Sequence, residues 1–488
     1  MSDETGPKDQ PLTEGVILSA ANGDVIRYDR SGLVMRLSDR VIGDIAARLS
    51  LPAQGEATAQ PDRDHLPLPD EIDAWDIRPD GDWLRFMARL PGRQGIRGFR
   101  RHRSGGAIIA EGRGPLLGIL GIGGARAALG WPQAAPAFPY HILAPADDIG
   151  AVGVAGTESA EARERLEPVR DYTHEALIAE CLLTERLERG VALPLFMVRV
   201  ETDEAPTARA LATGKALDNL EVNALSLTRA AVALGTDARL LAVTLDFALE
   251  DVSGDPVAYR DGMIALMEAI TLRLGKLGFA QPPFLATFDC GTHLITESPA
   301  LAGQWDLSWN HADHRLIYVA PGYMFAQDTT ARLTEAGHAA RAALYAAALT
   351  QIAAGANWQC PVVHLAEAVG TVIRLTCASL APLIIDAEDP FGAGSAAGFR
   401  LLGGAKGQKI LRAEVDPKDA KAVLLHCAGP VDPKDLQVSY AYGAPPGVGP
   451  GPANCGALRD EWSGSVKGQT LRRWALPAIL PVVAGGRG

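Results

Sequence analysis

The spacing of apolar positions changes along the chain and marks out a middle region. There, unbroken apolar runs such as LPLFMVRV (193–200) and LLAVTLDFAL (240–249) alternate with stretches of helical apolar spacing, such as 216–237 and 257–278. Strands that alternate with helices predict a parallel sheet with helices on both faces. We therefore expect an α/β domain of three layers, α/β/α, over residues 148–352.

The regions on either side have a different pattern, of short strands separated by turn residues. Near residues 70–115 the runs DWLRFMARL and GIRGFRRHR predict a small β-rich module, and a proline-rich stretch marks its end. After the α/β domain, GTVIRLTCAS, KILRAEV and QVSYAYG predict further strands. The expected domains are an N-terminal attachment segment (1–60), the β-rich module (61–147), the α/β domain (148–352) and a C-terminal β-rich appendage (353–488).

Composition and charge exclude several classes of protein. Of the 488 residues, 47% are apolar and 21% charged, as in globular proteins, and no apolar run approaches the ~20 residues of a membrane span. The start, MSDETGPKDQ, is polar and unlike a secretory signal. The net charge of −12 argues against a general nucleic-acid binder. None of the six cysteines forms a CxxC pair, so we expect reduced, mostly buried thiols and neither metal nor cofactor.

Four segments together carry a family resemblance. They are DNLEVNALSLTRAAVAL (218–234), AVTLDFALEDVSGDPVAYRDGMIALM (242–267), ARLTEAGHAARAALYA (331–346), and VSYAYG followed by PANCGALRDEW (438–462). In this order and at this spacing they resemble the SGNH (GDSL-type) hydrolases of the sialate O-acetylesterase kind, over about 148–465. The resemblance implies an SGNH-like fold for the α/β domain and descent from a carbohydrate O-acetylesterase.

The first two catalytic blocks that the resemblance implies are altered. Such an esterase needs a serine in a G-x-S turn after the first strand, with backbone N–H groups as an oxyanion hole. In VAGTESAEA the serine position holds Glu158, and Ser159 comes one residue late. In EAPTARAL a family glycine is replaced by Pro206, which has no N–H to donate.

The other two blocks are altered as well. In the acidic block the family's glycine and glutamate are replaced by Ala248 and Leu249. In DTTARLT the D-x-x-H positions hold Thr329 and Arg332, and an arginine cannot act as a base near neutral pH. Because four separate blocks are altered, we expect that hydrolysis is lost. If a cleft is kept, we expect it at the carboxyl ends of the strands, where open α/β sheets bind ligands.

Two further groups of side chains are candidates for binding. Flat rings pack against the apolar faces of sugars, which makes Trp305 and Trp309 candidates for sugar contact; core packing is the alternative. Arginines gather in RLPGRQGIRGFRRHR, the one basic cluster of an acidic chain. Its members Arg97, Arg100 and Arg101 are candidates for docking to an acidic protein surface or an anionic glycan, and a solvated strand face is the alternative.

Two other motifs are weaker. His311 and His314 lie three residues apart, but no third ligand is evident, so we expect no metal there. The glycine-rich run LGILGIGGARAALG (117–130) has no βαβ unit around it, so we expect a turn or close packing rather than a nucleotide site.

The sequence thus predicts a non-catalytic, esterase-derived protein that binds a cell-surface polysaccharide. Degenerate SGNH domains behind small β modules resemble receptor-binding spikes or fibres of phage-like particles, and a gene transfer agent is one such particle. Its expected partners are other particle proteins and the glycan, without nucleic acid or membrane insertion; homo-oligomers are left open. We expect it to be made in the cytoplasm and carried on the particle surface. Two alternatives stay open: a structural adaptor, and an active O-acetylesterase in which Ser159 works with His174, His293 or His338.

Overall fold

The chain divides into two units, Met1–Leu66 and Pro67–Gly488. The computed structural model describes residues 15–19, 25–29, 32–36, 72–133, 135–328, 332–404, 407–466 and 468–486. Most of the expected attachment segment (1–60) lies outside the described residues. Its described part is an antiparallel sheet of three strands: β1 (Gly15–Ser19), β2 (Val25–Asp29) and β3 (Gly32–Arg36).

The second unit begins with the expected run of short strands. They form an antiparallel four-stranded sheet of β4 (Ala74–Asp80), β5 (Trp83–Arg89), β6 (Ile96–His102) and β7 (Ile108–Ala110). Apolar and polar residues alternate along β5, so Leu84, Phe86 and Ala88 are buried while Arg85 on the other face is exposed.

The central sheet of this unit has seven strands in the order β11-β10-β13-β8-β14-β15-β16. All neighbouring strands are parallel except β11, which pairs antiparallel with β10. The strands are β8 (Leu116–Gly123), β10 (Ile142–Pro145), β11 (Leu166–Pro168), β13 (Phe196–Thr202), β14 (Ala238–Asp246), β15 (Phe284–Phe288) and β16 (Leu316–Pro321). The expected mixed α/β class is confirmed.

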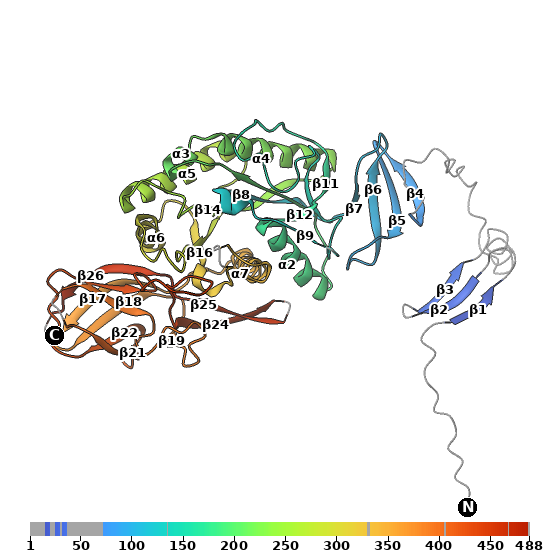
Figure 1. Ribbon diagram of the computed structural model, residues 1–488. Coiled ribbons are helices and arrows are strands. Elements are labelled where there is room, and N and C mark those ends of the chain that lie inside the picture. Colours follow the sequence, from blue (N-terminus) through green and yellow to red (C-terminus); the bar gives the residue numbers. More distant parts are fainter. Residues whose placement is uncertain are drawn as a thin grey trace, which may run out of the picture. The chain divides into compact units, whose positions relative to one another are not determined.

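Helices pack against both faces of this sheet (Figure 1). Along β8, Leu116, Leu120 and Ile122 join a core with α4 and α5, whereas Leu117 and Ile119 join a second core with α2 and α7. This two-residue alternation is what a strand buried on both faces requires. The helices are α2 (His174–Glu188), α3 (Ala208–Leu211), α4 (Lys215–Ala233), α5 (Pro256–Lys276), α6 (Pro299–Asn310) and α7 (Glu335–Ala353).

The sheet begins earlier in the chain than expected, which corrects the boundary at residue 148. Both β8 and β10 precede that residue, so the expected boundary divides one sheet. The glycines of the run that forms β8 favour a turn by their composition. Two of them instead allow close packing: a Cβ on Gly118 would lie 2.5 Å from a methyl carbon of Leu227, and one on Gly121 would lie 2.6 Å from Thr244 Oγ1.

After α7 the chain forms two sheets in which most neighbouring strands are antiparallel. One has the order β20-β23-β26-β17-β18-β22-β21 and the other β19-β24-β25. The strands are β17 (Val362–Val369), β18 (Val372–Ala378), β19 (Leu383–Ile385), β20 (Phe399–Gly403), β21 (Ile410–Asp416), β22 (Asp419–Cys427), β23 (Leu436–Tyr440), β24 (Leu458–Val466), β25 (Gln469–Trp474) and β26 (Ala478–Ala484). They share a third core, and α6 contacts β17 and β26.

Candidate functional site

The carboxyl end of β8 lies at the centre of the sheet, between the ends of β13 and β14. This is the point where the strand order reverses, the position at which α/β sheets bind ligands. The Gly124 N–H donates to the Asp246 carbonyl at 3.0 Å, and the Asp203 N–H donates to the Gly123 carbonyl at 3.1 Å. A Cβ on Gly123 would lie 2.2 Å from that Asp246 oxygen, so only glycine fits there.

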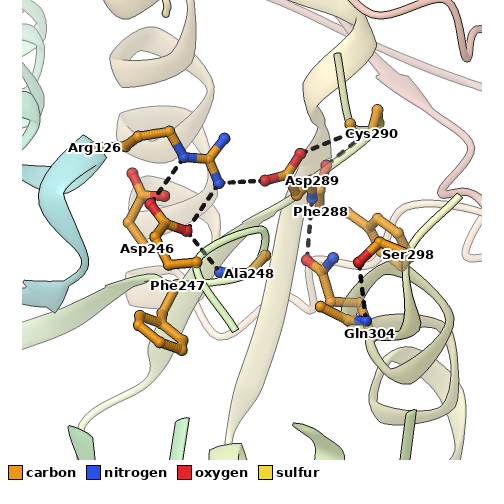
Figure 2. Close-up of polar contacts among 12 residues, drawn as sticks. Arg126, Asp246, Phe247, Ala248, Phe288, Asp289, Cys290, Ser298 and Gln304 are labelled. Carbon is orange, nitrogen blue, oxygen red and sulfur yellow. Dashed lines mark hydrogen bonds and ion pairs between the residues drawn. The ribbon is translucent and has the colours of Figure 1, made fainter. Parts of the chain in front are cut away.

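Arg126 comes two residues after this turn in the chain. It lies in the short 3-10 helix η2 (Ala125–Ala128) and reaches two carboxylates from different loops (Figure 2). Its Nε donates to Glu250 Oε1 at 2.9 Å, and its Nη2 donates to Glu250 Oε2 at 3.1 Å and to Asp289 Oδ2 at 2.5 Å. Burial alone would lower the pKa of Arg126. The carboxylates of Asp289 and Glu250 outweigh burial and hold that pKa well above its usual value.

Asp289 is itself fixed from both sides. Its Oδ1 accepts from the Gly291 N–H at 2.8 Å, and its backbone N–H donates to Gln304 Oε1 of α6 at 3.0 Å. The side chain of Gln304 is buried, and Figure 2 shows it pointing toward the backbone at Asp289. The Arg126 cluster of Arg126, Glu250 and Asp289 therefore ties together the loops after β8, β14 and β15.

A second ion pair lies beside this cluster. Arg341 of α7 donates from Nη1 to Asp246 Oδ2 at 2.9 Å, and Arg341 is almost fully buried. Burial alone would raise the pKa of Asp246, but Arg341 and then Arg126 outweigh it and lower that pKa. The Asp246 carboxylate is therefore held in the ionised form by arginine.

A cavity of about 60 Å³ lies among these ion pairs. Asp246, Asp289 and the three arginines Arg126, Arg332 and Arg341 are among its lining residues, together with His338. His338 is 2% exposed, packs edge-on against Trp131 at 4.3 Å between ring centroids, and makes no hydrogen bond from either ring nitrogen. Burial, and then Arg341, lowers its pKa to about 3, so the ring is neutral at pH 7.

A smaller cavity of about 10 Å³ shares Asp246 and Arg341 with the first. Its lining includes two buried titratable groups from the start of α2, His174 and Glu175. Glu175 accepts a hydrogen bond from Thr244 Oγ1 at 2.6 Å, and burial raises its pKa. Burial lowers the pKa of His174 far below its usual value, and that ring packs edge-on against Tyr345. The space is that of a single water molecule.

Three of the four altered blocks meet at this edge. The Val252 N–H donates to the Pro206 carbonyl at 2.9 Å, which joins the loops that carry Pro206 and Ala248. Ala248 is buried and Leu249 partly exposed. Arg332 is exposed and lines the larger cavity just before α7, and Asp328 Oδ1 accepts from its backbone N–H at 3.1 Å. Thr329 lies outside the described residues.

The first block lies elsewhere, which corrects the alignment that the resemblance gives it. Val152 bridges to Val200 of β13, so the chain before this block runs beside β13 rather than along β8. Glu158 and Ser159 are exposed next to α4, where Asn219 Nδ2 donates to the Glu158 carbonyl at 3.0 Å. The apolar run IGAVGVAG (149–156) predicts a buried strand, but the first strand of the sheet is β8.

No serine–histidine pair is assembled at the sheet edge among the residues that the structure describes. The hydrogen bond of this kind that does occur joins Ser104 Oγ to His102 Nδ1 at 2.8 Å, beside the turn after β6. The three histidines considered as partners of Ser159 lie elsewhere: His174 and His338 are buried near the cavities, and His293 lies in the loop before α6.

The two candidate tryptophans lie on α6, away from the cavity among the arginines. Trp305 is half-buried, and its Nε1 donates to the Val363 carbonyl of β17 at 2.8 Å. Trp309 is 39% exposed, with its ring 5.5 Å from that of Trp305 and 5.9 Å from His364. Trp305 also lines an open groove of about 580 Å³, together with Tyr442, Glu297, Asp306 and Gln437.

The three candidate docking arginines differ in exposure. Arg100 is 8% exposed; its Nη1 donates to the Leu234 carbonyl at the end of α4, and its guanidinium lies 5.7 Å from the centre of the Trp83 ring. Arg97 is half-buried and donates to the Gln94 carbonyl at 2.9 Å. Arg101 donates to the Gly106 carbonyl at 2.8 Å. Arg100 is therefore shielded from a flat protein partner.

His311 and His314 contact each other, with Nε2 and Nδ1 3.0 Å apart. Within the described ranges, no three His, Cys, Asp or Glu side chains are grouped as metal ligands would be. In the same part of the chain, no helix combines the length and apolarity that crossing a membrane requires.

The sequence reasoning missed the Arg126 cluster and the Gly123–Gly124 turn. The available signal was a strand-like run that ends in two glycines and is followed by a short helical segment, the pattern of a strand–turn–helix ligand site. Without an evident βαβ unit around it, that signal favours a plain turn. The order of strands β8, β10 and β13 follows from long-range pairing that periodicity alone does not predict.

No protein-family model matches the sequence, and no curated protein matches it. Among solved structures the chain is similar to a carbohydrate acetylesterase from Xanthomonas citri, with a TM-score of 0.43 and 15% sequence identity over 83% of this chain and 96% of that one. A similarity of this size carries no argument about family or activity. The function of this chain must therefore be inferred from its own residues.

Proposed function

We propose that this protein is a non-catalytic descendant of SGNH-type carbohydrate esterases and that it binds a saccharide. One observation carries the loss of catalysis. The resemblance requires a G-x-S turn directly after the first strand of the sheet. That strand is β8, and the residues at this turn are Gly123, Gly124 and Ala125. The nucleophile position therefore holds an alanine, which has no group to attack an ester.

The surroundings of Ala125 support the same conclusion. The base position holds Arg332, and a guanidinium does not act as a base in proteins. Arg126 and Arg341 are engaged with carboxylates, so the polar groups at this edge neutralise one another. Of the described residues around the larger cavity, Thr287 alone carries a hydroxyl, and that hydroxyl lies 3.0 Å from Tyr345 Oη.

For the saccharide we propose the groove beside α6. The partly exposed ring of Trp305 offers an apolar surface, and Glu297, Asp306 and Gln437 offer hydrogen-bond partners around it. A groove of about 580 Å³ with one aromatic surface and a few polar groups has the size and lining of a ligand site. Trp309 does not line this groove, so its contribution to binding should be smaller than that of Trp305.

The wider setting is also part of the proposal and rests on the sequence alone. The protein would be carried on the surface of a phage-like particle, would reach a cell-surface polysaccharide with its α/β and C-terminal parts, and would attach through residues 1–140, with the segment 1–60 leading. The structural adaptor is the alternative that the engaged arginines favour, because they leave a cavity of only about 60 Å³ at the ancestral site.

Two assays test the proposal. Hydrolysis of acetylated monosaccharides by the full chain should equal the buffer blank, and turnover that disappears in Ser159→Ala would show that the active-esterase alternative is correct. Binding to a panel of neutral oligosaccharides should weaken at least about tenfold in Gln437→Ala or Trp305→Phe. Trp75→Ala, an exposed tryptophan of β4, is the matched control and should bind as the unaltered chain does. If no neutral oligosaccharide binds, the adaptor alternative stands.

A further inference from the structure

A second groove lies at the opposite, amino-terminal edge of the central sheet. It has a volume of about 570 Å³ and lies between the four-stranded sheet, the start of β8 and the end of α4. Its described lining includes four arginines, from three different parts of the chain, against one glutamate: Arg85, Arg97, Arg100, Arg113 and Glu111. Because the whole chain carries a net charge of −12, this concentration of positive charge is local.

The register of the four-stranded sheet places two of these cations against each other. Arg85 of β5 is directly opposite Arg100 of β6, an arrangement that destabilises a sheet when both side chains are charged. Arg85 is compensated by Asp80 at 2.7 Å and Glu111 at 3.2 Å. Arg100 has no carboxylate partner among the described residues, and its buried Nε makes no hydrogen bond.

The remaining two arginines extend the groove. Arg97 donates from its Nε to the Gln94 carbonyl, and its side chain lines the groove. Arg113 is exposed, and none of the described residues gives its side chain a hydrogen bond or ion pair. Gly98 keeps the floor open, since a Cβ there would lie 2.6 Å from Glu111 Oε2. The groove thus presents guanidinium donors that nothing in the described chain satisfies.

We infer that this groove binds the carboxylate or sulfate groups of an acidic saccharide. The planar fork of a guanidinium matches the two oxygens of such groups, and several guanidinium groups around one concave space favour a ligand with more than one acidic group. The inference rests on the proposed function only in taking a saccharide as the ligand; the groove is separate from the one beside α6.

The form of the groove favours a saccharide over a macromolecular surface. Protein interfaces have an apolar, fairly flat central patch, whereas this groove is concave and lined mainly by charged and backbone groups. Single-stranded nucleic acids need aromatic rings for base stacking, and none is among the described residues that line it. An acidic sugar needs neither.

The test is calorimetric titration of the full chain with three probes at low ionic strength: tetragalacturonate, a neutral tetrasaccharide, and inorganic sulfate. We expect tetragalacturonate to bind and the binding to weaken in high salt. Arg113→Ala and Arg97→Ala should each weaken it about tenfold, whereas Glu111→Gln, which removes the opposing carboxylate, should strengthen it. Arg93→Ala, an exposed arginine of the same segment that does not line the groove, is the control and should change nothing.

Three results would overturn the inference: no binding of tetragalacturonate, equal binding of the neutral tetrasaccharide, or binding that Arg97→Ala and Arg113→Ala leave unchanged. Binding of sulfate without the saccharide would also overturn it, since the site would then accept only a small oxyanion. Esterase turnover, by contrast, would contradict the proposed function and leave this groove unaffected, so the two failures can be told apart.

Discussion

At the scale of single residues, Arg126 shows how one side chain can hold together the loops at the carboxyl end of the sheet. One guanidinium holds Glu250 and Asp289, which come from two different loops. We expect Arg126→Ala to lower the free energy of unfolding by about 1–3 kcal/mol, less than for a fully buried pair because Arg126 is partly exposed. Arg126→Lys should recover only part of this loss, since an ammonium lacks the planar fork that holds Glu250 with two hydrogen bonds and reaches Asp289 with a third. Urea denaturation measures both.

The control for this prediction is a surface ion pair. Arg170 lies 3.5 Å from Asp148 and 3.7 Å from Glu167 and is well exposed. Arg170→Ala should change stability by less than about 0.5 kcal/mol. Equal losses in Arg126→Ala and Arg170→Ala would mean that the Arg126 cluster has no special structural role.

The buried histidines set the response to acid. Burial lowers the pKa of His338 to about 3 and that of His141 to about 4, while an unfolded chain takes up a proton at each near pH 6.5. Between these values the unfolded state binds more protons, so stability falls as the pH drops from about 6.5, by up to about 1.4 kcal/mol per pH unit for each histidine. Glu175, whose pKa burial raises, opposes this because its contribution is lost as the pH rises.

The measurement is the free energy of unfolding at several pH values between about 4 and 7, in the unaltered chain and in His338→Gln. The variant should show the shallower slope. Asp246, whose pKa is lowered, loses its contribution only at more acidic pH and does not interfere in this range. Parallel curves would mean that the His338 ring is already solvated in the folded state.

At the scale of elements, the glycines of β8 decide how closely the neighbouring loops approach. We expect Gly123→Ala to destabilise the fold by about 1–3 kcal/mol or more, because the new Cβ would meet the Asp246 carbonyl. Gly275→Ala in α5 should act in the opposite direction and stabilise by about 0.5–1 kcal/mol, since its Cβ would point into open space. Thermal denaturation compares the two; a tolerated Gly123→Ala would mean that the turn can shift.

The elements of the α/β part could largely be predicted from periodicity. Helices such as α4 and α5 and the strands β13, β14 and β15 lie where their apolar spacing indicates. The exception is β8, whose three glycines suppress the strand signal although all eight of its residues are buried. Its glycines are required by close contact with residues such as Leu227 and Thr244, which are more than 100 residues away in the sequence. A local pattern of apolar residues does not show such contacts.

The candidate site could be predicted only in part for the same reason. Arg332 and Pro206 lie at the expected edge, because each directly follows or precedes an element that the sequence indicates. Glu158 and Ser159 do not lie at that edge, because their expected position assumed that the run before them forms the first strand of the sheet. Arg126 reaches Glu250 and Asp289, 124 and 163 residues further along the chain, and such partners are defined only by the folded sheet.

At the scale of the whole molecule, the division of the chain predicts what each unit can do alone. All three hydrophobic cores found among the described residues belong to the second unit, Pro67–Gly488. We therefore expect a chain that begins at Pro67 to fold by itself, with a thermal midpoint within about 2 °C of the full chain. Because both grooves consist of residues beyond Pro67, its binding of neutral and acidic saccharides should also be unchanged.

Attachment to the particle should depend on a part of the chain that neither folding nor saccharide binding requires. If residues 1–60 lead the attachment to a particle, the chain that begins at Pro67 should bind saccharides as before but fail to enter the particle. The measurement is to purify particles from cells that make either the full or the shortened chain and to probe those particles for the protein. Gln437→Ala in the full chain is the matched control, because it should weaken binding of neutral oligosaccharides and leave incorporation intact. Incorporation of the shortened chain would place the attachment surface within Pro67–Gly488 and would contradict the assignment of the first 60 residues.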